Sequence, residues 1–169
     1  MDPTQLSREL REGTSPDLQR RRQIIGLSMV GATMGQLVSL YQTGIIKHLP
    51  DPPISIFDAD RVDSSEYAYK RLDTPDGLMM VTTYALTAWL AGAGGEDRAR
   101  TNPWLPIAMG AKLAIDIATN LKLASEEWQE NKALCEYCQL ASLASIASLA
   151  IAVPEITTAV QTLMGQSQK

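Results

Sequence analysis

The sequence predicts an all-α fold: an integral membrane bundle of four helices, with a long exterior loop between the first helix and the second. Long runs without a charged residue indicate this, because a membrane-spanning helix needs about 20 predominantly apolar residues. These runs comprise residues 24–46, 77–95 and 137–154. A soluble α-helical bundle is the alternative. We favour the membrane because the runs show no polar face of the kind that a soluble bundle needs.

Composition excludes several classes of protein. Of the 169 residues, 45% are hydrophobic and 20% are charged, with a net charge of −4. The chain is therefore not disordered, and it has no excess of positive charge for binding nucleic acid. Two cysteines cannot make a disulfide scaffold. With a single histidine, His48, there is little material for a metal site, and we expect none.

Residues 103–124 form a fourth, weaker candidate for a span. They include Lys112 and Asp116, which a helix places on one face. Charges within a membrane are costly and usually pair, so we expect an ion pair between these two side chains. A soluble or interfacial amphipathic helix is the alternative. Small residues are frequent in the spans, as in the GxxxG pattern from Gly31 to Gly35, and they let membrane helices pack closely.

The charged segments orient the predicted bundle. Three arginines, at positions 20–22, precede the first span, and cytoplasmic flanks of membrane helices are enriched in Lys and Arg. We therefore expect a polar cytoplasmic segment (1–22), a four-helix domain (23–156) and a polar C-terminal tail (157–169). Both termini then lie in the cytoplasm of a bacterial-type inner membrane or a thylakoid membrane. The loop 48–76 faces the exterior. At about 29 residues it is long for a structureless connection, so we expect it to cap the bundle or carry function; a solvated loop without chemistry is the alternative.

The strongest chemical feature is the pair Cys135 and Cys138, at the exterior mouth of the last span. Residues three apart share a face of a helix and lie within reach of a disulfide. A helix N-terminus stabilises a thiolate, an effect that Lys132 strengthens and Glu136 opposes. A dithiol that faces an oxidising compartment suits thiol–disulfide exchange. Two buried, inert cysteines are the alternative.

Four spans, a long loop after the first and a CxxC motif at the start of the fourth resemble the vitamin K epoxide reductase (VKOR) family. Residues 133–141 (ALCEYCQLA) are similar to the bacterial members around the motif. Residues 59–65 (ADRVDSS) fall where the family has its loop cysteines, and residues 74–77 (TPDG) resemble its entry into the second helix. The resemblance covers residues 22–155, and the CxxC is its sharp motif.

The resemblance implies a membrane oxidoreductase that passes electrons from the CxxC pair to a quinone of the menaquinone, ubiquinone or phylloquinone type. The quinone would bind among the four helices, nearer to Cys138. Cys135 would exchange with a loop cysteine pair that relays electrons from a thioredoxin-like thiol donor. This chain has no loop cysteine; Ser64 and Ser65 stand in that region. Because a hydroxyl cannot exchange disulfides, an external thiol would have to reach Cys135 directly.

Two functions therefore remain open. The first is a quinone-dependent thiol–disulfide oxidoreductase with Cys135 and Cys138 as catalytic residues. Tyr84, Asn120 and Ser142 are then candidate hydrogen-bond donors to the quinone, by their positions on the spans. The second is a redox-silent VKOR-like subunit or assembly factor that acts by docking within a membrane protein complex. The retained CxxC favours the first function and the missing loop cysteines favour the second; we prefer the first.

Overall fold

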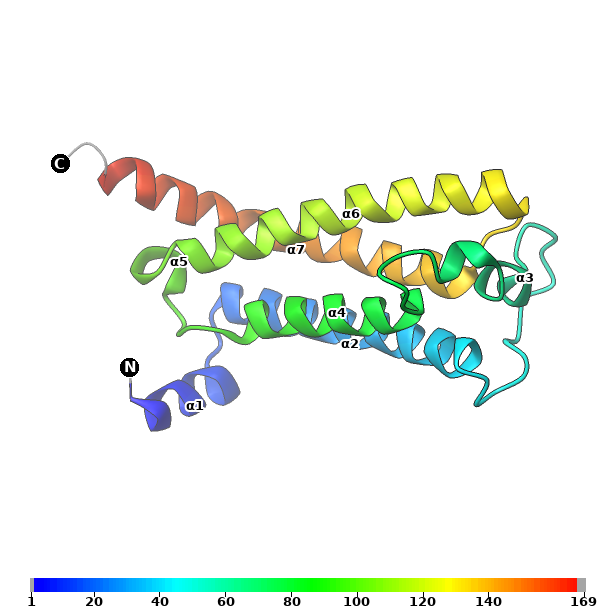
Figure 1. The fold of residues 1–169 in the computed structure, drawn as a ribbon. Coiled ribbons are helices and arrows are strands. Elements are labelled where there is room, and N and C mark those ends of the chain that lie inside the picture. The colour runs from blue at the N-terminus through cyan, green and yellow to red at the C-terminus, as the bar shows by residue number, and fades with distance from the viewer. Residues whose placement is uncertain (1, 167–169) are drawn as a thin grey trace.

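The computed structural model describes residues 2–166 of the chain, and the predicted all-α class is confirmed. Four long helices run side by side (Figure 1), and α2 packs against both α4 and α7 while α6 packs against α7. The long helices are α2 (Pro16–Gln42), α4 (Asp76–Gly92), α6 (Trp104–Asn131) and α7 (Glu136–Gln166). The short elements are α1 (Pro3–Glu12), α3 (Ala59–Asp63), the 3-10 turn η1 (Glu66–Ala68) and α5 (Arg98–Thr101).

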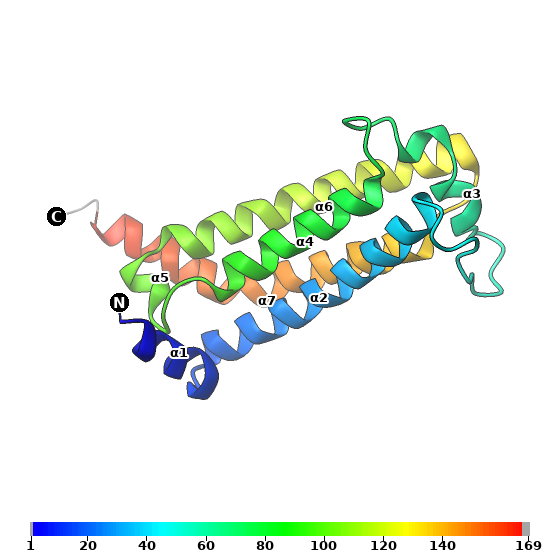
Figure 2. The same cartoon turned by 60° about the horizontal axis from the view of Figure 1, so that its bottom comes forward.

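The two ends of the bundle differ in content. α1 and the C-terminal part of α7 lie at one end, and α3 lies at the other, beside the start of α7 (Figure 1). Figure 2 shows the same arrangement after rotation, with the segment around α3 folded over that end of the helices. The connection between α2 and α4 is therefore a compact cap, built on two short helical elements.

Two of the long helices extend beyond the expected spans. α2 begins at Pro16, where Ser15 caps it by accepting a hydrogen bond from the Leu18 backbone N–H at 3.3 Å. Proline suits the first helical position because its missing N–H needs no partner there. α7 continues through Pro154 to Gln166. The expected divisions after residues 22 and 156 thus fall inside continuous helices.

Close packing of α2 on α4 depends on the GxxxG pattern. A Cβ atom at Gly31 would lie 2.5 Å from the ring of Tyr84, and one at Gly35 would lie 2.8 Å from the Cβ of Met80. Any side chain at these positions would therefore push the helices apart. Small residues at such contacts let the backbones approach until van der Waals packing holds them.

The expected ion pair on α6 is present. Lys112 Nζ lies 2.5 Å from an Asp116 carboxylate oxygen, and both side chains are largely buried. Lys112 also donates to the Thr83 carbonyl of α4 at 2.6 Å. The i, i+4 spacing explains why the two charges meet, and the bond to α4 explains why they point into the bundle.

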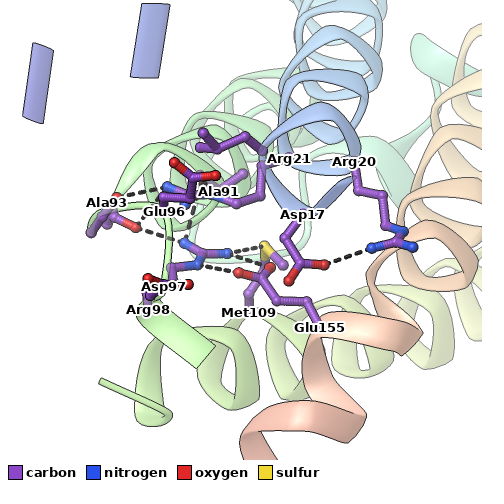
Figure 3. Close-up of polar contacts among 12 residues, drawn as sticks. Asp17, Arg20, Arg21, Ala91, Ala93, Glu96, Asp97, Arg98, Met109 and Glu155 are labelled. Carbon is purple, nitrogen blue, oxygen red and sulfur yellow. Dashed lines mark hydrogen bonds and ion pairs between the residues drawn. The ribbon is translucent and has the colours of Figure 1, made fainter. Parts of the chain in front are cut away.

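A second buried ion cluster, at the end that holds α1, was not expected (Figure 3). Arg98 of α5 donates to the two Glu155 carboxylate oxygens of α7 at 2.7 and 2.9 Å. Arg21 of α2 donates to the Ala91 carbonyl at 2.7 Å and to three further carbonyls of the turn after α4. Carbonyls at a helix C-terminus have no partner within the helix. Arg21, expected as a flanking charge, is instead 1% exposed and ties α2 to α4.

Two helices are long and apolar enough to cross a membrane by length and composition. They are α2 and residues Glu136–Gly165 of α7. α4 has 17 residues, about 25 Å of helix. α6 carries the Lys112–Asp116 pair within its apolar stretch. The other two long helices do not meet this criterion because α4 is short and α6 contains charged residues.

Candidate functional site

The two cysteines lie where α6 turns back into α7. Lys132 ends α6 in a left-handed conformation, with φ of 54°. The connection then runs alongside the cap, where the Leu134 backbone N–H donates to the Ile56 carbonyl at 2.9 Å. Cys135 directly precedes α7, and Cys138 lies in its first turn. The turn therefore places both sulfur atoms at the entrance to the bundle.

Both cysteines are free thiols, and they differ in exposure. Cys135 is fully buried, whereas Cys138 is partly exposed. The Cys138 backbone N–H donates to the Cys135 sulfur at 3.3 Å, as the free N–H groups of a helix N-terminus can. Burial nevertheless raises the pKa of the Cys135 thiol to about 12, because desolvation disfavours the thiolate. The helix N-terminus therefore favours the thiolate as expected, but burial outweighs this effect, and Lys132 faces solvent.

A cavity of about 250 Å³ adjoins Cys138, between α4, α6 and α7. The predicted donors Tyr84, Asn120 and Ser142 all line this cavity, together with Cys138. Cys135 is not part of the lining. Apolar side chains form much of the remaining wall: Met79, Met80, Leu123 and Ala141. The structure therefore brings one of the two cysteines together with all three predicted donors around one largely apolar space.

The three polar side chains differ in how they use their hydrogen-bond donors. The Tyr84 hydroxyl donates to the Ala141 carbonyl, and the Ser142 hydroxyl donates to the Cys138 carbonyl at 2.8 Å. The Asn120 side chain lies within hydrogen-bond reach of the Tyr84 hydroxyl and lines the cavity. Because an amide carries two N–H groups, Asn120 can contact Tyr84 and still donate to a molecule in the cavity.

Charged groups also border the cavity on the side of the cap. Arg71 pairs with Glu126 at 3.0 Å. Glu127 lies 3% exposed and has no ion pair in the described part of the chain. Its carboxylate accepts a long hydrogen bond, 3.4 Å, from the Cys135 backbone N–H. The cavity therefore has charged groups near the cysteines, and along the helices its apolar wall is interrupted by Thr83 and Asp116.

This geometry can be compared with known proteins. The sequence model of the vitamin K epoxide reductase family matches residues 22–153. The chain belongs to this family. VKOR proteins are membrane-associated thiol–disulfide oxidoreductases linked to quinones. Comparisons with curated proteins and with solved structures give no significant match.

In this VKOR family member, the loop covers the dithiol rather than adding cysteines to it. Ala59 and Val62 of α3 are buried in one apolar cluster with Cys135. The Tyr137 hydroxyl fastens the cap to α7 by donating to the Pro50 carbonyl at 2.8 Å. Cys135 has no exposed surface. The expected direct access of an external thiol to Cys135 is therefore closed in this conformation.

Sequence reasoning missed one group at the dithiol, the carboxyl of Asp63 in α3. It is 1% exposed, neither of its oxygens bonds to an N–H or O–H group in the described structure, and its partner is the Cys135 thiol. One of these oxygens and both cysteine sulfur atoms lie within 4.8 Å of one another. Three groups are fewer than the four ligands of a structural zinc site, and we assign no metal here. The sequence does contain one indication of this position. Ala59, Val62 and Asp63 are buried together, and their spacing places them on one face of a helix.

Proposed function

We propose that the chain is a membrane oxidoreductase that passes two electrons from a dithiol, through Cys135 and Cys138, to a quinone. The observation that carries this proposal is the cavity that Cys138 shares with Asn120. Its position puts a redox-active sulfur and a hydrogen-bond donor on the same apolar space. Membership of the VKOR family supplies the class of chemistry.

Outward-facing apolar side chains support a membrane location for all four long helices. A large exposed apolar surface is unusual on a soluble monomer. Each helix contributes large apolar side chains that are at least 44% exposed: Met29 and Val30, Leu78 and Leu86, Ile115 and Leu121, Leu143 and Val153. We infer that lipid tails cover this surface and that α4 and α6 span the membrane with α2 and α7.

We infer that the cap and the dithiol face the exterior, and that both termini lie in the cytoplasm of a bacterial-type inner membrane or a thylakoid membrane. α1 and the C-terminal part of α7 share one end of the bundle (Figure 1). The basic residues at positions 20 and 22 belong to that end and favour its cytoplasmic placement. The divisions after residues 22 and 156 then mark where α2 and α7 leave the membrane.

The cavity fits the headgroup of a quinone. Its volume of about 250 Å³ is slightly below the 300–1,000 Å³ that is typical for whole drug-sized ligands. It therefore suits the ring system of a quinone whose apolar tail lies outside, among the helices. Met79, Met80 and Leu123 form apolar walls, and Asn120 offers the amide donor. The residues do not distinguish menaquinone, ubiquinone and phylloquinone types.

When bound, a quinone supplies an acceptor for two electrons and two protons. Cys138 lines the cavity and is the sulfur closest to this acceptor's site, so electrons leave the dithiol through it. Asn120 donates to the oxygen that becomes more negative during reduction, an effect that is strong in a site without water. Cys135 supplies the second sulfur of the disulfide. Tyr84 shapes the wall, with its hydroxyl held by Ala141.

The electron donor has to reach the disulfide from the exterior. A thioredoxin-like protein would have to displace the cap, because Ala59 and Val62 cover Cys135. The cap is held to the connection before α7 by few backbone bonds, such as Leu134 N–H to the Ile56 carbonyl. Local opening of such segments requires much less free energy than global unfolding. We propose that donor binding and cap opening occur together.

One observation favours the second candidate function, a redox-silent membrane subunit. The full burial of Cys135, together with the absence of loop cysteines, is also what an inert pair would show. In that case the cap and the outer faces of the helices would serve as docking surfaces for another membrane protein. The two candidates differ in whether a quinone oxidises the dithiol.

Thiol trapping in native membranes tests the proposal. The protein is reduced, freed of reductant and exposed to a short-chain quinone, and free thiols are then alkylated and counted by mass spectrometry. We expect quinone-dependent loss of two alkylation sites in the natural chain. Cys135→Ser and Cys138→Ser variants should each keep one alkylated cysteine, whether or not quinone is added.

A pair that stays reduced with quinone, in protein that still melts cooperatively, would contradict the proposed function. Denatured protein treated with the same quinone controls for chemical oxidation of exposed thiols. Oxidation that is equally fast in folded and denatured protein would also contradict it, because a binding site for the quinone would then play no part.

A further inference from the structure

Asp63 is a buried ionisable group beside the dithiol that the proposed electron path leaves unused. Its side chain lies in α3, against the sulfur atoms of Cys135 and Cys138, within 4.8 Å of both. It is 1% exposed; neither oxygen bonds to an N–H or O–H group of the described structure, and its partner is the Cys135 thiol. A carboxyl whose partner is a weak thiol donor is costly in such a place. Structural roles of buried carboxyls normally involve hydrogen bonds or cations, which makes a purely structural explanation poor.

The charged groups that act on Asp63 are all carboxylates. They come from the other helices that meet at this end: Asp76 of α4, Glu127 of α6 and Glu136 of α7. Burial is the largest effect and raises the pKa of Asp63, a hydrogen bond from the Cys135 thiol lowers it, and the three carboxylates raise it further, to about 8. Near neutral pH the group can therefore both hold and release a proton.

We propose that Asp63 carries the proton of the Cys135 thiol, accepting it when the disulfide closes and returning it when the disulfide opens. This inference rests on the thiol chemistry of the proposed function and not on the quinone. Burial of Cys135 is what makes the carrier necessary. A thiolate is strongly disfavoured there, and water does not reach the sulfur.

Closure of the disulfide breaks two S–H bonds and forms one S–S bond. The two electrons leave through Cys138 to the acceptor, which is the quinone in the proposed function. Cys138 gives its proton on the cavity side, and Cys135 gives its proton to the Asp63 carboxylate. The acceptor takes up the Cys138 proton and one proton from solution. Asp63, which is itself buried, releases its proton to solution when the cap opens, and the numbers of protons taken up and released are then equal.

Opening of the disulfide uses the same group in reverse. A donor thiol forms a mixed disulfide with Cys135, and Cys138 leaves as a thiol after gaining a proton. The second donor thiol then releases Cys135 as a thiolate in a buried place. The Asp63 carboxylic acid donates its proton to that sulfur. The role is general acid–base catalysis, which typically contributes about 10²–10⁴-fold to a rate.

The test compares Asp63→Asn with Asp73→Asn in the full-length protein in detergent. Asp73 lies in the same cap, is exposed, and has positive φ that asparagine tolerates. Reduced protein is oxidised with glutathione disulfide or with a short-chain quinone between about pH 5 and pH 10, a range that brackets the ionisation of Asp63. The rate of loss of alkylatable thiols is measured. The natural chain and Asp73→Asn should show a rate that rises with an inflection near pH 8.

Asp63→Asn should lose this inflection and oxidise about 100-fold more slowly above it. An unchanged rate and an unchanged inflection in Asp63→Asn would overturn the inference. Infrared difference spectra between the reduced and oxidised natural protein provide a second readout. They should contain a carboxyl C=O band that is absent in Asp63→Asn and present in Asp73→Asn. The absence of any redox-linked carboxyl band in the natural protein would also overturn it, even if Asp63→Asn failed to fold.

The two oxidants separate this inference from the proposed function. Oxidation by glutathione disulfide that depends on Asp63, without any oxidation by quinone, would support the proton carrier and refute the quinone path. Quinone oxidation at the same rate in Asp63→Asn and the natural chain would support the quinone path and refute the proton carrier.

Discussion

Replacement of Glu155 by glutamine tests how the end of the bundle opposite the dithiol is held together. Glu155 is the carboxylate that Arg98 contacts through two hydrogen bonds, at 2.7 and 2.9 Å. Both side chains are at most 2% exposed, and Arg21 lies close enough to Arg98 for their charges to repel. Glutamine keeps the shape and one acceptor oxygen. It leaves two buried guanidinium groups without a carboxylate.

The expected loss is large because an uncompensated charge remains buried. Removal of one partner from a buried ion pair typically costs about 3–5 kcal/mol. For a protein of this size, 1 kcal/mol shifts the melting temperature by about 2–4 °C. We therefore expect Glu155→Gln to melt roughly 10 °C lower in detergent. The matched control is Glu130→Gln at the exposed Lys70–Glu130 pair, where both side chains are more than 40% exposed and the loss should stay below about 1 kcal/mol.

Thermal melting followed by tryptophan fluorescence or circular dichroism measures both variants. Equal melting temperatures for Glu155→Gln and Glu130→Gln would refute the reasoning, because the buried pair would then contribute no more than a surface pair. A second variant, with methionine at Arg98 and leucine at Glu155, should recover part of the loss. This double variant loses the hydrogen bonds that Arg98 donates to carbonyls, but it leaves no unpaired charge where Arg98 and Glu155 meet.

Three further predictions concern the dithiol end. Gly31→Ala should displace Tyr84, because the added Cβ would lie 2.5 Å from its ring. We expect quinone-dependent disulfide formation to slow about 10-fold. The control is Gly26→Ala, whose added Cβ meets nothing within 4 Å and should leave the rate unchanged. Thiol trapping measures both, and equal rates would contradict the packing argument. Asn120→Leu should raise the quinone concentration for half-maximal oxidation about 10-fold, because about 1.4 kcal/mol of hydrogen bonding is lost. The rate of oxidation by glutathione disulfide should not change. A change in both would show that the thiols themselves are disturbed. Folding should also depend on pH through Asp63, whose pKa is raised from 3.8 to about 8. The folded state then keeps this proton up to a higher pH than the unfolded state does. The contribution of Asp63 to the free energy of unfolding is therefore complete below about pH 4 and is lost as the pH rises through about 8. Melting temperatures across this range should fall more steeply with pH in the natural chain than in Asp63→Asn, and parallel curves would contradict the assignment.

Features with local spacing could be predicted from the sequence. Lys112 and Asp116 are four residues apart on one helix, and their pairing follows from helical geometry alone. The placement of Cys135 and Cys138 at the start of the last helix follows in the same way from the uncharged run behind them. The positions of helices also limit which side chains can face the interior. Because of this limit, the sequence alone was enough to predict Asn120, on the third long helix, as a candidate donor.

Contacts between distant segments could not be predicted in this way. Arg98 and Glu155 are 57 residues apart, and nothing in either neighbourhood indicates a partner. Arg21 stands in a run of three arginines that has the character of a cytoplasmic flank, and only the turn after α4 explains its burial. The activation of Cys135 was misjudged for a related reason. The helix N-terminus is visible in the sequence, but the cap that removes water from the sulfur is not.

The two ends of the bundle treat buried charge in opposite ways, and this difference bears on function. At the end with Arg21, every buried ion has partners: Arg98 binds Glu155, and Arg21 binds carbonyls. Apart from the contact of Asp63 with the Cys135 thiol, the buried side-chain atoms without a hydrogen-bond partner, among the described residues, belong to Asp63, Asn131 and Glu136. All three lie at the dithiol end. Buried polar groups without partners reduce stability, and proteins retain such costs mainly at functional sites. Buried charges are therefore paired at the end with Arg21, where they only hold the helices together. Around the CxxC, buried polar groups lack such partners. That contrast argues against an inert cysteine pair, whose surroundings would be expected to be as well satisfied as the other end.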